Sequence, residues 1–501
     1  MRTTSGSRLD LAVSVAVHLA TLLTILGSLL PVRALRAAGQ DRSLEIEALV
    51  QSYADAGQFS GAVLVAEEDE IVYRGAYGLA NREWNISNDV DTKFRIGSIT
   101  KSFTATLVLQ LAAEGMLDLD SSIGHHLTEF SGKETGTITI QQLLTHSSGL
   151  PDYNDMPVVF RLVQGGLSKE ERLRQIADYP LHFQPGSGFG YSNDGYVVLG
   201  AILEKVIGEP YEAILGERIL VPLEMNDSGY FSPATIIEKR ASGYRQTVVG
   251  YENAPHYRES PASGMYSTVN DLYRWQRALA GDRVLPRATL QRIWGEALGS
   301  NVYGWRASYR TVDGDSLLMI ENDGAVFGFF ARMIRVPRDG FVVILLANVR
   351  RGPVNYLPRI GYAIVDLLHG RHYDRPLRSI AQALYPIVQS SGRREAVARY
   401  DLWLRERPDD FDFRESELNE LGYQLLSEER IDDAILIFER NVMAYPESWN
   451  VYDSLGEAYA LKGECEKAIE AYERSLHLNP QNGNAKEQLR SLRSRVCRPA
   501  G

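Results

Sequence analysis

Four strand-like segments, arranged in two pairs that lie far apart in the sequence, most constrain the fold of this chain. The segments are residues 61–66, 71–77, 329–336 and 341–348. The acidic turn Glu67–Glu70 joins the first pair, and Pro337–Gly340, whose proline and glycine favour a turn, joins the second. A further strand is expected over residues 316–320, and amphipathic helices lie in between. This order predicts an α+β fold, in which the two ends of the segment close an antiparallel sheet beside an all-helical region.

The pattern changes near Asp374, after which helix follows helix and no further strand is expected. Pairs of positions that match at a spacing of 34 residues are Leu421-Gly422 with Leu455-Gly456, Ala434 with Ala468, Phe438 with Tyr472, and Pro446 with Pro480. Small residues recur where paired helices must approach, so the period resembles tetratricopeptide repeats. Two units are marginal alone, so the helices within residues 376–407 are expected to cap or join the stack. A buttress and a partner-binding surface are about equal alternatives for this region.

Ser98 and Lys101 lie three residues apart in the stretch Gly97–Ala105, a small-residue turn that leads into an apolar-periodic helix. At this spacing two side chains are neighbours on one face of a helix. A desolvated lysine amine is driven toward its neutral form and can take the proton of a serine hydroxyl. A nucleophilic serine is one interpretation, and a polar helix start capped by Ser98 is the other. The spacing alone favours the second.

Further polar residues turn this pair into a candidate site. Tyr191 and Asn193 form a YxN pair, and Asn322-Asp323-Gly324 stands before the strand that begins near Phe329. Taken singly, Tyr191 could fill a turn, and Asn193 could be the N-cap of the helix that follows. Taken together with the serine and lysine, these residues favour catalysis.

The order of these motifs resembles the penicillin-binding-protein-like serine hydrolases, the superfamily of class C β-lactamases, D-alanyl-D-alanine carboxypeptidases, D-aminopeptidases and related esterases. The stretches that carry the resemblance are FRIGSITKSFTA, LLTHSSGLPDY, YSNDGYVVLGAILEKVIGEPY, ASGMYSTVNDLYRW and GAVFGFFARM. The resemblance covers roughly residues 51–368 and leaves the repeats outside. It implies a sheet and helices with the site at their junction.

By this resemblance Ser98 is the acyl-accepting nucleophile, and Lys101 with Tyr191 activates it. Asn193 is expected to hold Lys101 and to donate to the substrate amide. The backbone N–H groups of Ser98 and of Ala325, which follows Gly324, are expected to form the oxyanion hole. His146 is expected to pack or cap rather than to catalyse, and Tyr153 to line the rim of the pocket.

The third motif departs from the family's usual KTG, or its variant with histidine. Asn322 and Asp323 stand where a lysine and a threonine help hold a substrate carboxylate. Losing the positive charge removes a charge-assisted hydrogen bond worth about 1.5 to 3 kcal/mol. Alternate strand residues face opposite ways, so Asp323 need not face the cleft. We therefore expect weak activity on penicillins and on peptides with a free carboxylate; an uncharged ester, or a peptide whose amine an acidic residue binds, fits better.

The N-terminus predicts export. Arg2 and Arg8 precede an apolar run over residues 11–30, and Pro31–Ala34 has the small-residue spacing of a signal cleavage site. The run is long for a signal peptide and contains His18, so an uncleaved membrane anchor is the alternative. A periplasmic or extracellular location is expected in either case.

Charge and cysteine content exclude several functions. The formal net charge of −11 argues against nucleic-acid binding, and the basic cluster at the C-terminus is short. Cys465 and Cys497 are the two cysteines, and no CxxC or Cys/His group exists, so a zinc site is not expected. No cofactor is expected for this chain. Whether these two cysteines pair is left open.

The predicted parts are a signal peptide or anchor over residues 1–38, a hydrolase domain over 41–372, a helical linker over 373–409 and a repeat domain over 410–498. The expected function is hydrolysis of a small-molecule, ester or peptide substrate through an acyl-serine intermediate. The alternative is a catalytically weak scaffold that recruits a cell-envelope partner through its repeats.

Overall fold

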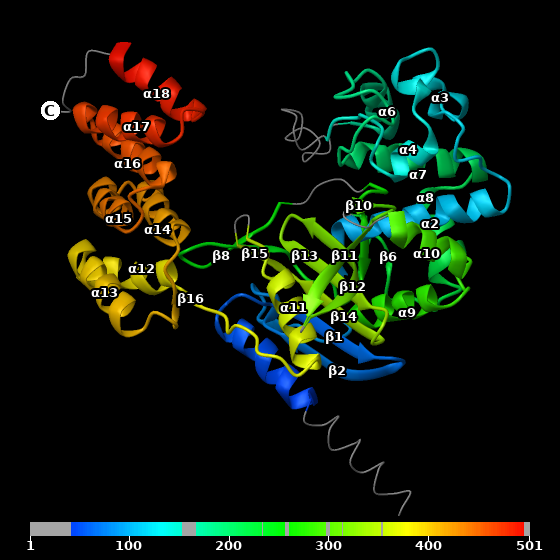
Figure 1. Ribbon diagram of the computed structural model, residues 1–501, viewed down its shortest axis with the longest axis horizontal. Coiled ribbons are helices and arrows are strands. Elements are labelled where there is room, and N and C mark those ends of the chain that lie inside the picture. The colour runs from blue at the N-terminus through cyan, green and yellow to red at the C-terminus, as the bar shows by residue number, and fades with distance from the viewer. Residues whose placement is uncertain are drawn as a thin grey trace, which may run out of the picture.

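The computed structural model describes residues 42–152, 167–232, 234–255, 260–296, 301–312, 314–351 and 354–494 (Figure 1). The predicted signal segment, Tyr153 and Cys497 lie outside these residues, so the expectations that concern them stay predictions. Among the described residues, no helix is both long and apolar enough to cross a membrane.

A seven-stranded antiparallel sheet forms the centre of the hydrolase-like part, in the order β10-β11-β12-β13-β14-β1-β2. The strands are β10 (Asn301–Val302), β11 (Trp305–Val312), β12 (Asp315–Val326), β13 (Phe329–Val336), β14 (Phe341–Ala347), β1 (Gly61–Glu67) and β2 (Glu70–Tyr77). Both predicted hairpins are present. Strand β1 pairs along its whole length with β14, from Gly61 opposite Ala347 to Glu67 opposite Phe341. The prediction that the two ends of the segment close the sheet is confirmed.

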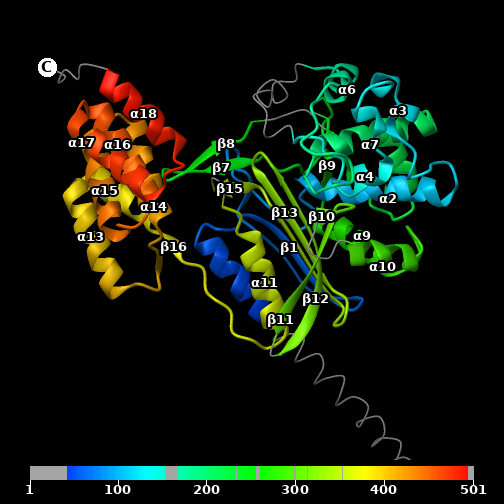
Figure 2. The ribbon, with the colours of Figure 1, turned by 45° about the horizontal axis from the view of Figure 1, so that its top comes forward.

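Helices cover both faces of this sheet. In β1, Ala62, Leu64 and Ala66 join one hydrophobic core, while Val63 and Val65 join the other. This alternation follows from the two-residue period of a strand, and burial on both faces explains why the segment is apolar throughout. The second core includes the helix over residues 42–55 and α11 (Leu357–Leu368), which lie side by side in Figure 2.

The opposite face supports the all-helical region. Its helices are α2 (Thr100–Ala113), α3 (Ile123–His126), α4 (Ile140–Leu144), α6 (Lys169–Ala177), α7 (Asn193–Ile207), α8 (Tyr211–Leu215), α9 (Val269–Ala280) and α10 (Arg287–Glu296). Small sheets link it to the main sheet: β3 (Leu79–Asn81) with β4 (Ile86–Ser87), β5 (Phe94–Arg95) with β9 (Met265–Ser267) and β6 (Gly229–Tyr230), and β15 (Val349–Arg351) with β7 (Tyr244–Gln246) and β8 (Tyr251–Asn253). The α+β prediction is confirmed.

The C-terminal part is helical and stands beside the sheet rather than on it (Figures 1 and 2). Its helices are α12 (Ile380–Ser391), α13 (Arg393–Glu406), α14 (Glu415–Ser427), α15 (Ile431–Ala444), α16 (Trp449–Lys462), α17 (Cys465–Leu478) and α18 (Gly483–Ser494). The expectation of no further strands is wrong. Two short parallel strands, β16 (Arg378–Ser379) and β17 (Phe411–Asp412), pair within it. Two residues are too few to show an alternating pattern in the sequence.

The third motif, Asn322-Asp323-Gly324, lies within a strand and not, as was expected, before one. Residues 322–324 are part of β12 rather than the entry to the next strand, with Asn322 opposite Met333 and Gly324 opposite Ala331 of β13. The polar residues interrupt the apolar pattern that marks a strand, although the backbone pairing continues through them.

Candidate active site

Ser98 lies in η1 (Gly97–Ile99), a turn of 3-10 helix that continues directly into α2. Gly97 has a φ of 54°, and a Cβ built on it would fall 2.6 Å from the backbone nitrogen of Ala325. Glycine is therefore required here both by conformation and by space. The N-cap of α2 is Ile99, and no side chain caps this helix. The interpretation of Ser98 as a helix cap is therefore wrong.

Two side chains converge on the Ser98 hydroxyl. Lys101 Nζ lies 3.2 Å from Ser98 Oγ, and the Tyr191 hydroxyl donates to the same oxygen at 3.0 Å. The first contact joins η1 to the first turn of α2, and the second joins it to the residue two positions before α7. Both are close enough to exchange a proton with the serine.

Lys101 is 1% exposed. Its ammonium donates to Asn193 Oδ1 at 2.7 Å and to the Ala262 carbonyl oxygen at 2.9 Å. Burial lowers the pKa of Lys101 to about 7, and the negative charge of Asp152 opposes that change. A substantial fraction of the amine is thus neutral near pH 7, as the serine-lysine interpretation requires.

Asn193 connects Lys101 to Asp152. While its Oδ1 accepts from the lysine, its Nδ2 lies 3.1 Å from each carboxylate oxygen of Asp152. This second contact fixes the orientation of the amide and engages the donor that was expected to serve the substrate. The N-cap of α7 is Ser192, whose hydroxyl accepts from the Gly195 N–H, so the alternative of Asn193 as the cap is wrong. Asp152 itself was not recognised in the sequence, where only its place beside Pro151 in the LLTHSSGLPDY stretch marked it.

Backbone contacts bring β12 against the serine. A Cβ on Gly324 would overlap the Ile96 carbonyl oxygen and would lie 3.2 Å from the Ser98 nitrogen. Together with the contact of Gly97 to Ala325, this places the N–H groups of Ser98 and Ala325 on neighbouring segments at the site. The expectation that both groups face one oxyanion stays a prediction.

The third motif presents an amide to the cleft side and a carboxylate to the other. Asn322 shares a strand face with Gly324, is 4% exposed, and its Nδ2 has no hydrogen-bond partner among the described residues. Asp323 faces the opposite way and pairs with Arg332 at 2.6 Å. Arg332 also pairs with the fully buried Glu321. Asp323 therefore brings no negative charge to the cleft, and the idea that it binds a substrate amine loses its support.

His146 is a buried packing residue. Its Nδ1 accepts from the Ser192 N–H at 3.1 Å, and its ring lies against Tyr191 with centroids 4.5 Å apart. Burial, with a smaller contribution from Lys101, lowers its pKa to about 3, so the imidazole stays neutral. This contact holds the segment that carries Tyr191, in agreement with the expected packing role. No group of three His, Cys, Asp or Glu side chains that could hold a metal ion occurs in the described part of the chain.

Comparison with known proteins places this site in a family. The family model described as Beta-lactamase matches residues 46–363. Esterase EstB of Burkholderia gladioli is 39% identical over 187 residues, which are 34% of this chain and 47% of EstB. This match therefore spans about half the length of that relative. Penicillin-binding protein 4* of Bacillus subtilis (strain 168) is 26% identical over 376 residues, 68% of this chain and 79% of the relative.

Comparison with solved structures supports the same family. A D-amino acid amidase from Ochrobactrum anthropi SV3, complexed with L-phenylalanine amide, has a TM-score of 0.57 and 26% identity. The alignment covers 66% of this chain and 99% of the amidase. The family model covers more than half of the sequence and includes every candidate site residue named above. The chain belongs to the β-lactamase family of serine hydrolases.

Proposed function

We propose that this chain hydrolyses an ester or amide through a covalent acyl intermediate on Ser98. The observation that carries the proposal is the pair of contacts at Ser98 Oγ, 3.2 Å to Lys101 Nζ and 3.0 Å to the Tyr191 hydroxyl. A serine with two proton carriers, one of them an amine with a pKa of about 7, is activated without histidine.

In the acylation step, Ser98 Oγ attacks the substrate carbonyl carbon while its proton passes to neutral Lys101. The resulting oxyanion accepts from the backbone N–H groups of Ser98 and Ala325. Each such donor is worth roughly 3 to 4 kcal/mol to the transition state. The carbonyl carbon then loses its bond to the leaving group, which departs with the proton that Lys101 relays through Tyr191. Water attacks the acyl ester in the second half, so that the acid is released and Ser98 regains its proton.

The substrate class follows from the third motif. Asn322 carries no charge, and the carboxylate of Asp323 is paired with Arg332 on the other face of β12. A substrate whose recognised end is uncharged fits such a cleft better than one that ends in a carboxylate. By their names, an esterase and a D-amino acid amidase are among the relatives. We propose an esterase- or amidase-like activity rather than an efficient β-lactamase.

A substrate panel tests this proposal. Purified protein is given p-nitrophenyl acetate, D-phenylalanine amide and nitrocefin, with Ser98→Ala as the control. We expect the ester or the amide to be hydrolysed faster than nitrocefin, and no hydrolysis above background by the alanine variant. Equal rates for the two proteins would refute the enzymatic proposal and leave the scaffold alternative.

We also propose that the C-terminal helices are tetratricopeptide-type repeats. A Cβ on Gly422 would overlap the Phe438 ring, and a Cβ on Gly456 would fall 3.1 Å from the Tyr472 ring. The same close approach of two helices therefore recurs at the 34-residue spacing, between α14 and α15 and again between α16 and α17. Such a stack commonly binds a peptide or protein, and the alternative function is recruitment of a cell-envelope partner by a catalytically weak enzyme.

We propose that residues 1–38 direct export of the protein, either as a cleaved signal peptide or as an uncleaved membrane anchor. Intact mass of the protein recovered from the envelope of an expressing bacterium tests it. A mass that lacks the N-terminal segment indicates cleavage, the full mass in the membrane fraction indicates an anchor, and recovery in the cytoplasm alone contradicts export.

A further inference from the structure

The β7–β8 hairpin, residues 244–253, reaches from the hydrolase part to the C-terminal helices (Figure 2). At its tip, Val248 is 8% exposed and belongs to the hydrophobic core of the C-terminal part, together with Ile380 and Leu384 of α12. The neighbouring Thr247 carbonyl accepts from Gln382 Nε2 at 3.0 Å. The tip is thus built into the helical part, although its strands belong to the catalytic part.

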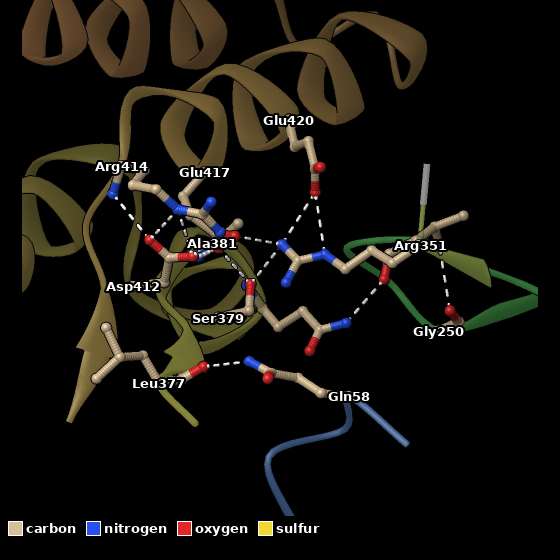
Figure 3. A network of polar contacts seen from close by, with 12 residues as sticks. Gln58, Gly250, Arg351, Leu377, Ser379, Ala381, Asp412, Arg414, Glu417 and Glu420 are labelled. Atoms are coloured by element: carbon tan, nitrogen blue, oxygen red, sulfur yellow. Dashed lines mark hydrogen bonds and ion pairs between the residues drawn. The ribbon is translucent and has the colours of Figure 1, made fainter. Parts of the chain in front are cut away.

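A buried ion pair fixes the same junction (Figure 3). Arg351 of β15, which pairs in register with Gln246 of β7, donates to Glu417 of α14 at 2.7 Å and to Ser379 Oγ at 2.8 Å. Glu420 accepts from the same guanidinium at 3.0 Å. Removing either partner alone would leave the other charge buried and unpaired, which is strongly unfavourable. The geometry of the junction is therefore tightly determined.

The base of the β7–β8 hairpin contacts the turn that follows β12, the strand that carries Ala325. A Cβ on Gly328 would fall 2.6 Å from the Gly243 backbone and 2.7 Å from Ala254 Cβ, the residues just before β7 and just after β8. Arg350, beside the anchoring arginine, donates to the Val326 carbonyl at 3.4 Å. Its guanidinium also covers the Phe330 ring at 4.6 Å. Val326 directly follows Ala325, whose N–H is proposed to bind the oxyanion.

We propose that the C-terminal helices position the oxyanion side of the active site, with the β7–β8 hairpin as the connecting element. This role rests on the proposed function of Ser98 and Ala325. It means that the C-terminal helices contribute to catalysis by holding the oxyanion site in place. Val248 and Arg351 are then positioning residues, since they touch no substrate. Anything that displaces the helices, a bound protein partner included, changes the rates of acylation and deacylation, which share the oxyanion hole, rather than the binding of substrate.

Two adjacent valines allow a matched test in the full chain. Val248→Ser places a hydroxyl in the helical core, and Val249→Ser makes the same change at a side chain that is 48% exposed. Two readouts are measured: kcat and KM for p-nitrophenyl acetate, and hydrogen exchange of the backbone amides of residues 325–329. Glu417→Gln, which keeps the shape of the anchor and removes its charge, serves as a second variant if Val248→Ser does not fold.

We expect Val248→Ser to speed hydrogen exchange at residues 325–329 and to lower kcat about tenfold with KM unchanged. The decrease in kcat should be smaller than the roughly hundredfold loss caused by removing one oxyanion donor, because the donor is displaced and not removed. Val249→Ser should match the wild type in both readouts. Exchange and kcat in Val248→Ser or Glu417→Gln equal to those of Val249→Ser would overturn the proposal. If the wild type hydrolyses nothing, the proposed function fails, while the exchange measurement alone still decides whether the helices hold this strand.

Discussion

The rate of acylation should follow the titration of Lys101. With a pKa of about 7 in the folded protein, about one lysine in eleven is neutral at pH 6 and about ten in eleven at pH 8. If the neutral amine takes the serine proton, the acylation rate constant rises about tenfold over this interval, with a midpoint near pH 7. Stopped-flow measurement of the first turnover of p-nitrophenol release gives the acylation rate constant at each pH. His146, whose pKa is about 3, contributes nothing in this range.

Asp152→Asn sharpens this prediction. The carboxylate of Asp152 favours the charged lysine, so its removal lets the pKa of Lys101 fall further. The midpoint of the profile should move to lower pH, and the rate at pH 6 should rise relative to the plateau. Asp178→Asn, at a carboxylate that is 69% exposed on the surface, is the control and should leave the profile in place. A rate that falls between pH 6 and pH 8 would refute the reasoning, because the charged lysine would then be the active form.

Three further predictions concern stability and specificity. Folding lowers the pKa of Lys101 from 10.5 to about 7, so between these pH values the unfolded chain binds more protons than the folded one. The unfolding free energy of the wild type should therefore rise by about 2 kcal/mol relative to that of Lys101→Met from pH 7 to pH 9. Urea titrations at both pH values check this, and an equal change in unfolding free energy for the two proteins would contradict it. Asn322→Lys restores a positive charge at the third motif and should improve kcat/KM for a peptide with a free carboxylate by about tenfold to a hundredfold; no gain over the wild type would show that this position does not face the substrate. Gly422→Ala places a methyl group into the Phe438 ring and should lower the unfolding free energy by about 1 to 3 kcal/mol, whereas Gly483→Ala, where nothing lies within 4 Å of the added Cβ, should change it little.

The sequence predicted five of the seven strands of the main sheet, because their signals are local, and it missed β10 and β11. The apolar runs of β1 and β14 are bounded by turn residues, and their lengths match the strands that form. The end of β12 was missed because Glu321 and Asn322 look like a loop. Their backbones nevertheless pair with β13, and the charge of Glu321 is neutralised by Arg332, which no local pattern reveals.

The candidate site was predicted in part. Ser98, Lys101, Tyr191 and Asn193 lie together as the motif order indicated, since spacing and order can be read from one chain. The contact of Asn193 with Asp152 could not be read in this way, because a carboxylate beside a proline has no pattern that separates it from a turn residue.

The contacts between the catalytic part and the C-terminal helices could not be predicted from the sequence either. Arg351 and Glu417 are charged residues that composition would assign to the surface, yet both are buried against each other. Pairing across such a distance in sequence depends on the tertiary fold, and only the three-dimensional arrangement shows it.

The most direct test of the central claim is the intact mass of the protein after reaction with a fluorophosphonate. The account predicts one adduct on the wild type, located at Ser98 by peptide mapping, and none on Ser98→Ala. Lys101→Met should react far more slowly, because the hydroxyl then lacks its proton acceptor. An unmodified wild type, or the same adduct on Ser98→Ala, would contradict the claim that Ser98 is the nucleophile.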